Sequence, residues 1–119
     1  MAPPETFTEC LFCKIAAREI SADIVHESDH VVAFRDIRPV APTHILLIPK
    51  DHIESAAVVG DEHGPLLAEM VQVAGHLAKA EGTEAGWRLV TNVGPDAGQS
   101  VFHLHFHLLG GRPMGWPPG

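Results

Sequence analysis

The pattern of hydrophobic and polar positions predicts one long helix among several short strands. Between residues 61 and 80, five apolar side chains fall on a single helical stripe: Leu66, Met70, Val73, Ala74 and Leu77. Pro65 suits an early turn of this helix, and Gly82 suits its end. A shorter apolar pattern over residues 10–19 predicts a second, short helix near the N-terminus.

Five segments have the length and composition of strands. They are Ile24–Glu27, His30–Arg35, His44–Ile48, Trp87–Val93 and Val101–Leu109. The continuous apolar run at 44–48 is typical of a central strand that is covered on both faces. Because the strands surround one long helix without regular β-α-β alternation, the pattern predicts an α+β fold with an antiparallel sheet. We expect one domain over residues 1–119, with a loose arm at 1–8 and a strandless tail at 110–119 that is rich in proline and glycine.

Composition excludes some classes of partner. The 8 basic and 15 acidic residues give a formal net charge of −7, which disfavours direct binding to a nucleic-acid backbone. No apolar run approaches the roughly 20 residues that span a bilayer, so no membrane partner is expected. The first residues lack the pattern of a signal peptide, and we therefore expect a cytoplasmic protein.

Histidine is the unusual component, with nine residues beside no tyrosine. His103, His105 and His107 alternate with apolar residues, so a strand would place them on one face, about 6.6–6.8 Å apart. A row of this kind fits a different role for each ring better than one shared metal ion. The remaining histidines without a motif are expected on the surface: His26, His30, His63 and His76.

A glycine-rich turn precedes these histidines. Gly94 and Gly98 would let backbone N–H groups point into one concavity, as in phosphate-binding nests, and Asn92 and Ser100 add polar side chains. An ordinary hairpin connection is the alternative. Neither a P-loop nor a dinucleotide-binding fingerprint is present.

The run His103-Leu104-His105-Phe106-His107-Leu108-Leu109 fits the pattern His-φ-His-φ-His-φ-φ, in which φ is apolar. On this motif the sequence resembles the histidine-triad (HIT) family, in its nucleotide-binding branch. The resemblance also covers residues 34–52, 92–103 and 115–119, with one departure at Ala97, where a second glycine often stands. It implies a HIT-like antiparallel sheet that dimerises into a continuous sheet.

The resemblance also implies an activity. Proteins of this branch hydrolyse purine nucleoside phosphoramidates or related adenylylated substrates through a nucleotidyl-histidine intermediate. His105 would be the nucleophile, His44 would orient the other rings, and Ser100 would assist the proton of the leaving group. The phosphoryl oxygens would be held by Asn92, Gly98, Gln99, Ser100 and His107.

Further residues are implied for the nucleoside and for assembly. Asp36 would bind the ribose hydroxyls, and Ile37 would pack on the base together with Phe34 and Ile24, for which a place in the core is at least as good an interpretation. The branch forms homodimers, and Trp116 in the tail would reach the active site of the partner chain.

Cys10 and Cys13 form a C-x-x-C pair that allows three interpretations: a redox pair, two core thiols, or half of a zinc site. His52 and His103 would complete a Cys2His2 set. The resemblance implies the same four ligands and a structural zinc ion. Two other functions compete with the phosphoramidase: a hydrolase that uses the histidine row to bind a catalytic metal, and a non-enzymatic nucleotide- and zinc-binding interaction module.

Overall fold

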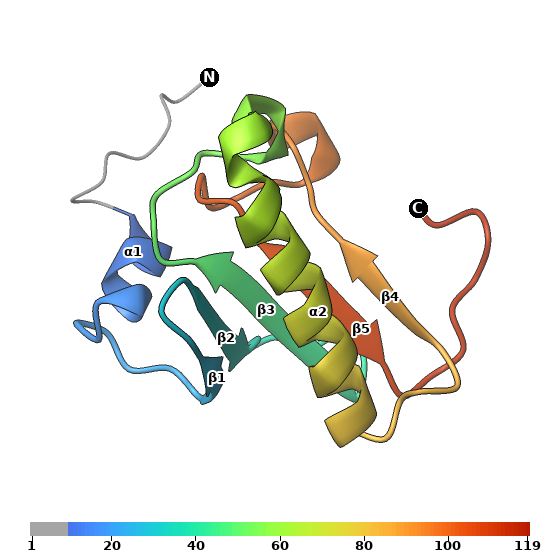
Figure 1. Cartoon of the computed structure of the whole chain (residues 1–119). Coiled ribbons are helices and arrows are strands. Elements are labelled where there is room, and N and C mark those ends of the chain that lie inside the picture. The colour runs from blue at the N-terminus through green and yellow to red at the C-terminus, as the bar shows by residue number, and fades with distance from the viewer. Residues whose placement is uncertain (1–9) are drawn as a thin grey trace.

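The computed structural model describes residues 10–119, so the arm expected at residues 1–8 lies outside the described residues. Its centre is a five-stranded antiparallel sheet with the strand order β1-β2-β3-β5-β4 (Figure 1). The strands are β1 (Ile24–Glu27), β2 (Val31–Arg35), β3 (Thr43–Pro49), β4 (Trp87–Val90) and β5 (Phe106–Gly110). The helices are α1 (Leu11–Ala16) and α2 (Gly64–Ala80), with short 3₁₀ helices at Ala56–Val58, Asp61–His63 and Pro95–Ala97. The predicted α+β class is confirmed.

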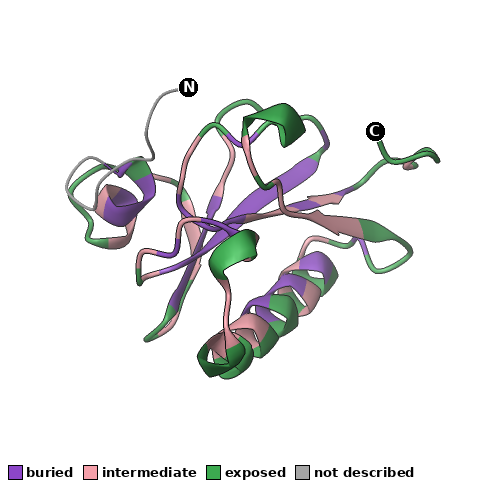
Figure 2. Cartoon of the chain, turned by 90° about the horizontal axis from the view of Figure 1, so that it is seen from above, coloured by how far each residue is buried: buried purple, intermediate pink, exposed green. Residues whose placement is uncertain are grey.

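Strand β3 separates two apolar cores, and all seven of its residues are buried. Ile45 and Leu47 face the cluster that contains α2, whereas Leu46 and Ile48 face the cluster that contains α1. This alternation follows from the period of two along a strand. In Figure 2 the buried positions run through the central strands. Burial of each such side chain contributes about 1.5–3 kcal/mol to the free energy of unfolding. Because β3 contributes side chains to both clusters, it anchors the packing on both faces of the sheet.

Helix α2 covers one face of the sheet with the stripe that the sequence predicts. Met70, Val73, Ala74 and Ala78 are buried, and Leu66 and Leu77 pack against them. The helix begins at Gly64 rather than Asp61, because residues 61–63 form a 3₁₀ turn. No helix in the described part of the chain is long and apolar enough to cross a membrane.

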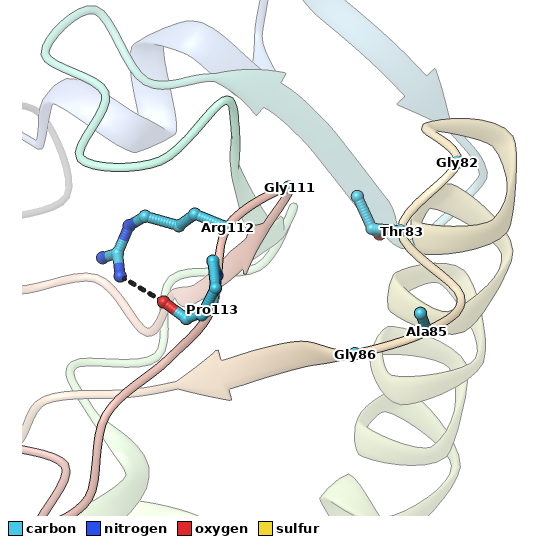
Figure 3. A pocket seen from close by; sticks show the side chains of 7 residues that line it. All are labelled: Gly82, Thr83, Ala85, Gly86, Gly111, Arg112 and Pro113. Atoms are coloured by element: carbon cyan, nitrogen blue, oxygen red, sulfur yellow. Dashed lines mark hydrogen bonds between the residues drawn. The ribbon is translucent and has the colours of Figure 1, made fainter.

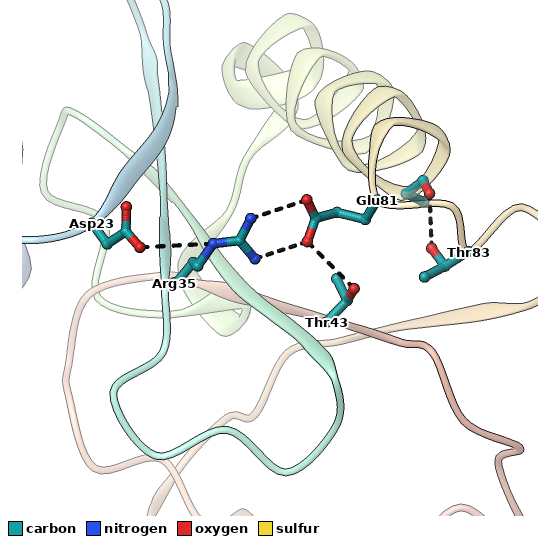
Figure 4. A network of polar contacts seen from close by, with 6 residues as sticks. Asp23, Arg35, Thr43, Glu81 and Thr83 are labelled. Carbon is teal, nitrogen blue, oxygen red and sulfur yellow. Dashed lines mark hydrogen bonds and ion pairs between the residues drawn. The ribbon is translucent and has the colours of Figure 1, made fainter.

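A polar network joins the C-terminal end of α2 to β2 and β3 (Figure 4). The guanidinium of Arg35 donates to both carboxylate oxygens of Glu81, at 2.8 and 3.0 Å, and lies 3.7 Å from Asp23. Thr43 also donates to Glu81, at 3.4 Å. The bond from Arg35 holds the pKa of Glu81 below its ordinary value. Because Arg35 and Thr43 directly precede Asp36 and His44, this network anchors the chain beside two predicted site residues.

The predicted strand over residues 101–109 is wrong in its first half, because β5 begins only at Phe106. The N–H of Leu104 donates to the carbonyl of Ile53, and the ring of His103 bonds to the carbonyl of Pro49. These bonds draw residues 101–105 away from the sheet. The three motif histidines therefore do not share one strand face.

Two smaller expectations also change. The strand expected at 87–93 ends at Val90, and just beyond it the hydroxyl of Thr91 donates to the carbonyl of His105. His30 and His76 are exposed, as expected, whereas His26 and His63 are half-buried. The Nε2 atom of His26 is buried without a hydrogen-bond partner among the described residues.

Candidate active site

The three motif histidines point into two separate clusters. His105 and His107 lie together, with ring centroids 5.0 Å apart. The ring of His103 instead lies 5.1 Å from that of His52 and beside the two cysteines. This division follows from the bend before β5, and it gives the rings different surroundings.

His105 presents an unprotonated nitrogen away from the backbone. Its Nδ1 atom lies 2.7 Å from the carbonyl oxygen of His103, and a carbonyl only accepts, so Nδ1 must carry the proton. Burial lowers the pKa of His105, although the bond to the carbonyl opposes this shift. The ring is therefore neutral near pH 7, with the lone pair on Nε2. An edge contact with Phe12, with centroids 5.0 Å apart, packs the ring in place.

A second chain of hydrogen bonds fixes the proton on His107. The backbone N–H of Val40 donates to Nδ1 of His44 at 3.1 Å, so neutral His44 carries its proton on Nε2. That Nε2 lies 2.9 Å from Nδ1 of His107 and 3.4 Å from a carboxylate oxygen of Asp36. As an acceptor at Nδ1, neutral His107 has its own proton on Nε2. His107 can therefore act as a hydrogen-bond donor.

Both rings of this pair are neutral at physiological pH. Burial, together with the neighbouring His105 and His44, lowers the pKa of His107 to about 4, against the opposing charge of Asp36. Burial also lowers the pKa of His44. The site therefore combines His105, which has an available lone pair on Nε2, with His107, which has an available N–H on Nε2.

The glycine-rich turn differs from the expected nest of free amides. The N–H groups of Gly98 and Gln99 donate within the turn, to the carbonyls of Pro95 and Gly94. The side chain of Gln99 is buried, where it accepts from Gly94 N–H and donates to the carbonyls of Glu54 and Val101. Gln99 thus braces the turn, and its amide and that of Gly98 are engaged in this structure.

Other predicted residues of the turn are better placed for contact with a ligand. Ser100 is exposed and Asn92 is half-buried. Gly94 and Gly98 have φ angles of 84° and 90°, which glycine adopts without strain. Ala97 lies in the 3₁₀ helix and has no positive φ, so the turn forms without the second glycine that is frequent in the family.

Of the residues expected to contact the nucleoside, some lie in the core and others at the surface. Phe34 is buried in the cluster beside α1, and Ile24 packs against that cluster, which confirms their place in the core. Ile37 is 91% exposed. One oxygen of Asp36 accepts from the N–H of Arg38 at 2.7 Å, as in a turn, while the other faces His44. The apolar surface near Asp36 therefore comes from Ile37.

The side chains of Cys10, Cys13, His52 and His103 converge, and all four ligand atoms lie within 4.8 Å of one another. Nδ1 of His52 is 3.2 Å from the sulfur of Cys13, and Nδ1 of His103 is 3.2 and 3.4 Å from the two sulfurs. A tetrahedral zinc ion would separate sulfur and nitrogen by about 3.6 Å, given its ordinary bond lengths. His103 donates from Nε2 to the carbonyl of Pro49 at 2.8 Å, which leaves the lone pair of Nδ1 facing the sulfurs. The donor set therefore fits zinc.

The C-x-x-C pair lies at the start of a helix, with Cys10 as the N-cap of α1. A second convergent group consists of Asp36, His44 and His107. Metal binding at Nε2 of His44 would displace the proton that the Val40 bond places there. In residues 10–119, no convergent group contains two of the motif histidines. The positions of the three motif histidines therefore do not match the alternative in which they bind one catalytic metal ion together.

The tail does not bring Trp116 to these histidines within one chain. It runs beside β4 (Figure 1), where Arg88 donates to the carbonyl of Gly115 at 2.8 Å. Trp116 is 84% exposed. A surface hollow of about 360 Å³ lies where the tail leaves the sheet, between Gly82–Gly86 and Gly111–Pro113 (Figure 3). None of the predicted site residues lines it.

Sequence reasoning missed three groups that organise the site: the N–H of Val40, the carbonyl of Pro49 and the ring of Phe12. Of these, only the N–H of Val40 could have been suspected from the sequence. Pro39 and Pro42 lack N–H groups, so Val40 is one of two backbone donors in that loop.

Comparisons with known proteins agree with these features. A family model described as scavenger mRNA decapping enzyme C-term binding matches residues 9–115. The chain is 51% identical over 108 residues to the purine nucleoside phosphoramidase of Escherichia coli (strain K12), covering 90% of this chain and 91% of that protein. It is 50% identical over 111 residues to the 14 kDa zinc-binding protein of Zea mays, covering 92% and 87%. The structure of a HIT family hydrolase from Legionella pneumophila Philadelphia 1 has a TM-score of 0.91 at 56% identity, covering 92% of this chain and 99% of that one.

The neutral state of His107 predicts a pH-dependent stability. Unfolded histidine gains a proton near its ordinary pKa of 6.5, whereas folded His107 stays neutral until about pH 4. The unfolded state therefore binds more protons between these values, and the free energy of unfolding falls as the pH falls. In His107→Gln this slope should decrease by at most about 1.4 kcal/mol per pH unit. Urea unfolding across this pH range measures it, and the exposed His76→Gln should keep the wild-type slope. Equal slopes in all three proteins would contradict a neutral buried His107.

Proposed function

Because the chain belongs to the histidine-triad (HIT) family of hydrolases, we propose that it hydrolyses purine nucleoside phosphoramidates, or related adenylylated substrates, through a nucleotidyl-histidine intermediate. One observation carries the proposal. The hydrogen bond from His105 Nδ1 to the carbonyl of His103 leaves the Nε2 lone pair available as a nucleophile. A neutral imidazole is an effective nucleophile at physiological pH.

In the first step, Nε2 of His105 attacks the α-phosphorus. The Nε2–P bond forms as the P–N bond to the amine breaks, and the electron pair of that bond leaves with the amine. Ser100 relays a proton from water to the departing nitrogen. The ring becomes positively charged, and its Nδ1–H bond to the carbonyl of His103 stabilises that charge.

The phosphoryl oxygens gain negative charge in this step. His107 donates to them from Nε2, with its proton placed there by His44. The hydroxyl of Ser100 and the side-chain amide of Asn92 add donors. Gly98 and Gln99 also contact the substrate in this proposal. To do so, their amides would have to exchange their hydrogen bonds within the turn for hydrogen bonds to the substrate. Because the proton of His107 is in place before the reaction, this donor lowers the barrier without reorganisation.

In the second step, water attacks phosphorus and loses one proton to the solvent. The P–Nε2 bond breaks, and the nucleoside monophosphate leaves with neutral His105 restored. The reaction therefore consumes one water and releases one amine. Splitting one displacement into two lowers each barrier. In this scheme Asp36 binds the ribose hydroxyls and Ile37 contacts the base.

Zinc is proposed as a structural component bound by Cys10, Cys13, His52 and His103. When bound, it would cross-link α1 to the segment before β5 in a closed tetrahedral site. Through the shared ion, Cys10, Cys13 and His52 would hold His103, and with it the carbonyl that orients His105. A cytoplasmic location fits this proposal, since reducing conditions keep both thiols available.

A homodimer is also proposed, with the partner's tail supplying Trp116 to the active site. Strand β4 lies at one edge of the sheet, where Trp87 is 37% exposed, and Val71 on α2 is 49% exposed. Pairing two β4 edges around a two-fold axis would bury this surface and extend the sheet across both chains.

Replacing the nucleophile tests the proposed reaction. His105→Ala should lower the rate of AMP release from an AMP–amine phosphoramidate by roughly a thousandfold or more, with AMP affinity nearly unchanged. The exposed His76→Ala should retain the wild-type rate. Mass spectrometry of the wild type during turnover should show a transient adenylyl adduct. A wild type that binds AMP without turning over phosphoramidates would instead support the interaction module.

Metal analysis tests the zinc proposal. Purified protein should contain about one zinc ion per chain, and Cys10→Ser or Cys13→Ser should remove it and lower the melting temperature. His30→Ala changes an exposed histidine outside the cluster and should keep the metal. A metal-free wild type, together with cysteine variants that melt at the wild-type temperature, would contradict a structural zinc site.

Shortening the tail tests its proposed role. Light scattering should give the full-length protein twice the mass of one chain. A protein that ends at Met114 should change its ranking of phosphoramidates with different amines more than its affinity for AMP, because Trp116 would contact the leaving group. Trp116→Ala should behave in the same way. An unchanged ranking would exclude this role, and a monomeric mass would exclude the dimer.

A further inference from the structure

The start of the C-terminal tail crosses the proline loop, which consists of Pro39, Val40, Ala41 and Pro42. Gly111 has a φ angle of 89°, and a Cβ atom there would lie 2.9 Å from Cβ of Pro42. Directly after this contact, Nε of Arg112 donates to the carbonyl of Val40 at 3.0 Å. Two adjacent tail residues therefore hold one loop.

The guanidinium of Arg112 has carbonyl partners. Besides Val40, it donates from Nη1 to the carbonyl of Pro113 at 3.1 Å (Figure 3). No ion pair between Arg112 and a carboxylate occurs within residues 10–119. A hydrogen bond from a charged donor is stronger than one between neutral groups, so the bond to Val40 restrains the loop.

Val40 is held at both ends of its backbone. Its carbonyl accepts from Arg112, and its N–H donates to Nδ1 of His44 at 3.1 Å. Since prolines lack N–H groups, only Val40 and Ala41 supply backbone donors in the loop. Arg112 therefore restrains the residue whose N–H selects the tautomer of His44.

The direction of the next hydrogen bond depends on that tautomer. With the proton of His44 on Nε2, this atom donates to Nδ1 of His107, and His107 keeps its proton on Nε2. If the proton of His44 moved to Nδ1, His107 would have to donate from Nδ1 and would lose its proton on Nε2. The same two rings would stay bonded, but Nε2 of His107 would then offer a lone pair instead of an N–H.

We propose that Arg112 is a positioning residue that holds the His44–His107 pair in the donor state through the backbone of Val40. Its effect on catalysis rests on the proposed phosphoryl-transfer function, in which His107 donates to the phosphoryl oxygens. Asp36 favours the same tautomer, because its carboxylate oxygen lies 3.4 Å from Nε2 of His44 and only accepts. Loss of Arg112 therefore weakens the preference without abolishing it.

The first test reads the tautomer directly. In protein labelled with ¹⁵N-histidine, the imidazole nitrogens of wild-type His44 should show a protonated Nε2 and an unprotonated Nδ1, with signals assigned by comparison with His44→Gln. In Arg112→Ala the two nitrogen shifts should move toward each other as the tautomers mix. Arg112→Lys keeps a charged donor and should restore most of the wild-type pattern. Unchanged shifts in Arg112→Ala would overturn the proposal.

Arg88→Ala is the matched control. It removes a different arginine that also donates to a tail carbonyl, that of Gly115, and no hydrogen bond or ion pair joins Arg88 to the proline loop among the described residues. It should leave the His44 shifts unchanged. Equal changes in Arg88→Ala and Arg112→Ala would show a general effect of releasing the tail and would overturn the assigned role of Arg112.

Kinetics test the catalytic part. Arg112→Ala should lower kcat for the AMP–amine phosphoramidate about 3- to 10-fold, with KM changed less than about twofold, because an exposed charged hydrogen bond is of moderate strength. A shifted tautomer with unchanged kcat would overturn the catalytic part. If wild type shows no turnover, the proposed function fails, while the nitrogen shifts still decide whether Arg112 positions His44.

Discussion

The hydrogen bond from His105 Nδ1 to the carbonyl of His103 is the interaction on which the rest of the site depends. It decides which nitrogen of His105 carries the proton, and so leaves the lone pair on Nε2. The bond requires residues 103–105 to leave the regular strand. That departure is produced by the bonds from Leu104 to Ile53 and from His103 to Pro49.

His103 connects two chemically different clusters. Its backbone orients His105, while its ring lies against the sulfurs of Cys10 and Cys13. Burial lowers the pKa of His103 to about 4, so its ring is neutral and can offer a lone pair. A change in the cysteine cluster would therefore reach His105 through one residue, because the ring of His103 lies in that cluster and its carbonyl accepts from His105.

Backbone groups set the proton positions in both halves of the site. The carbonyls of His103 and Pro49 accept from His105 and His103, and the N–H of Val40 donates to His44. Backbone groups have fixed donor or acceptor character, whereas a neutral imidazole has two tautomers. The main chain consequently imposes a defined tautomer on each ring, and burial keeps the rings neutral.

The sequence by itself determined the helix at α2, the central position of β3, the C-x-x-C pair and the three-histidine motif. Each depends on residue types at short, regular spacing, so local patterns were sufficient. They also suggested the four zinc ligands and the nucleophile, once joined to a family resemblance. The sequence did not reveal that His103 turns away from His105 and His107, because that depends on carbonyls and sulfurs contributed by distant segments. Nor did it show that the amides of Gly98 and Gln99 are engaged within their turn. Only the tertiary structure decided these features, because the direction of a hydrogen bond depends on which groups the fold brings within about 3 Å of one another.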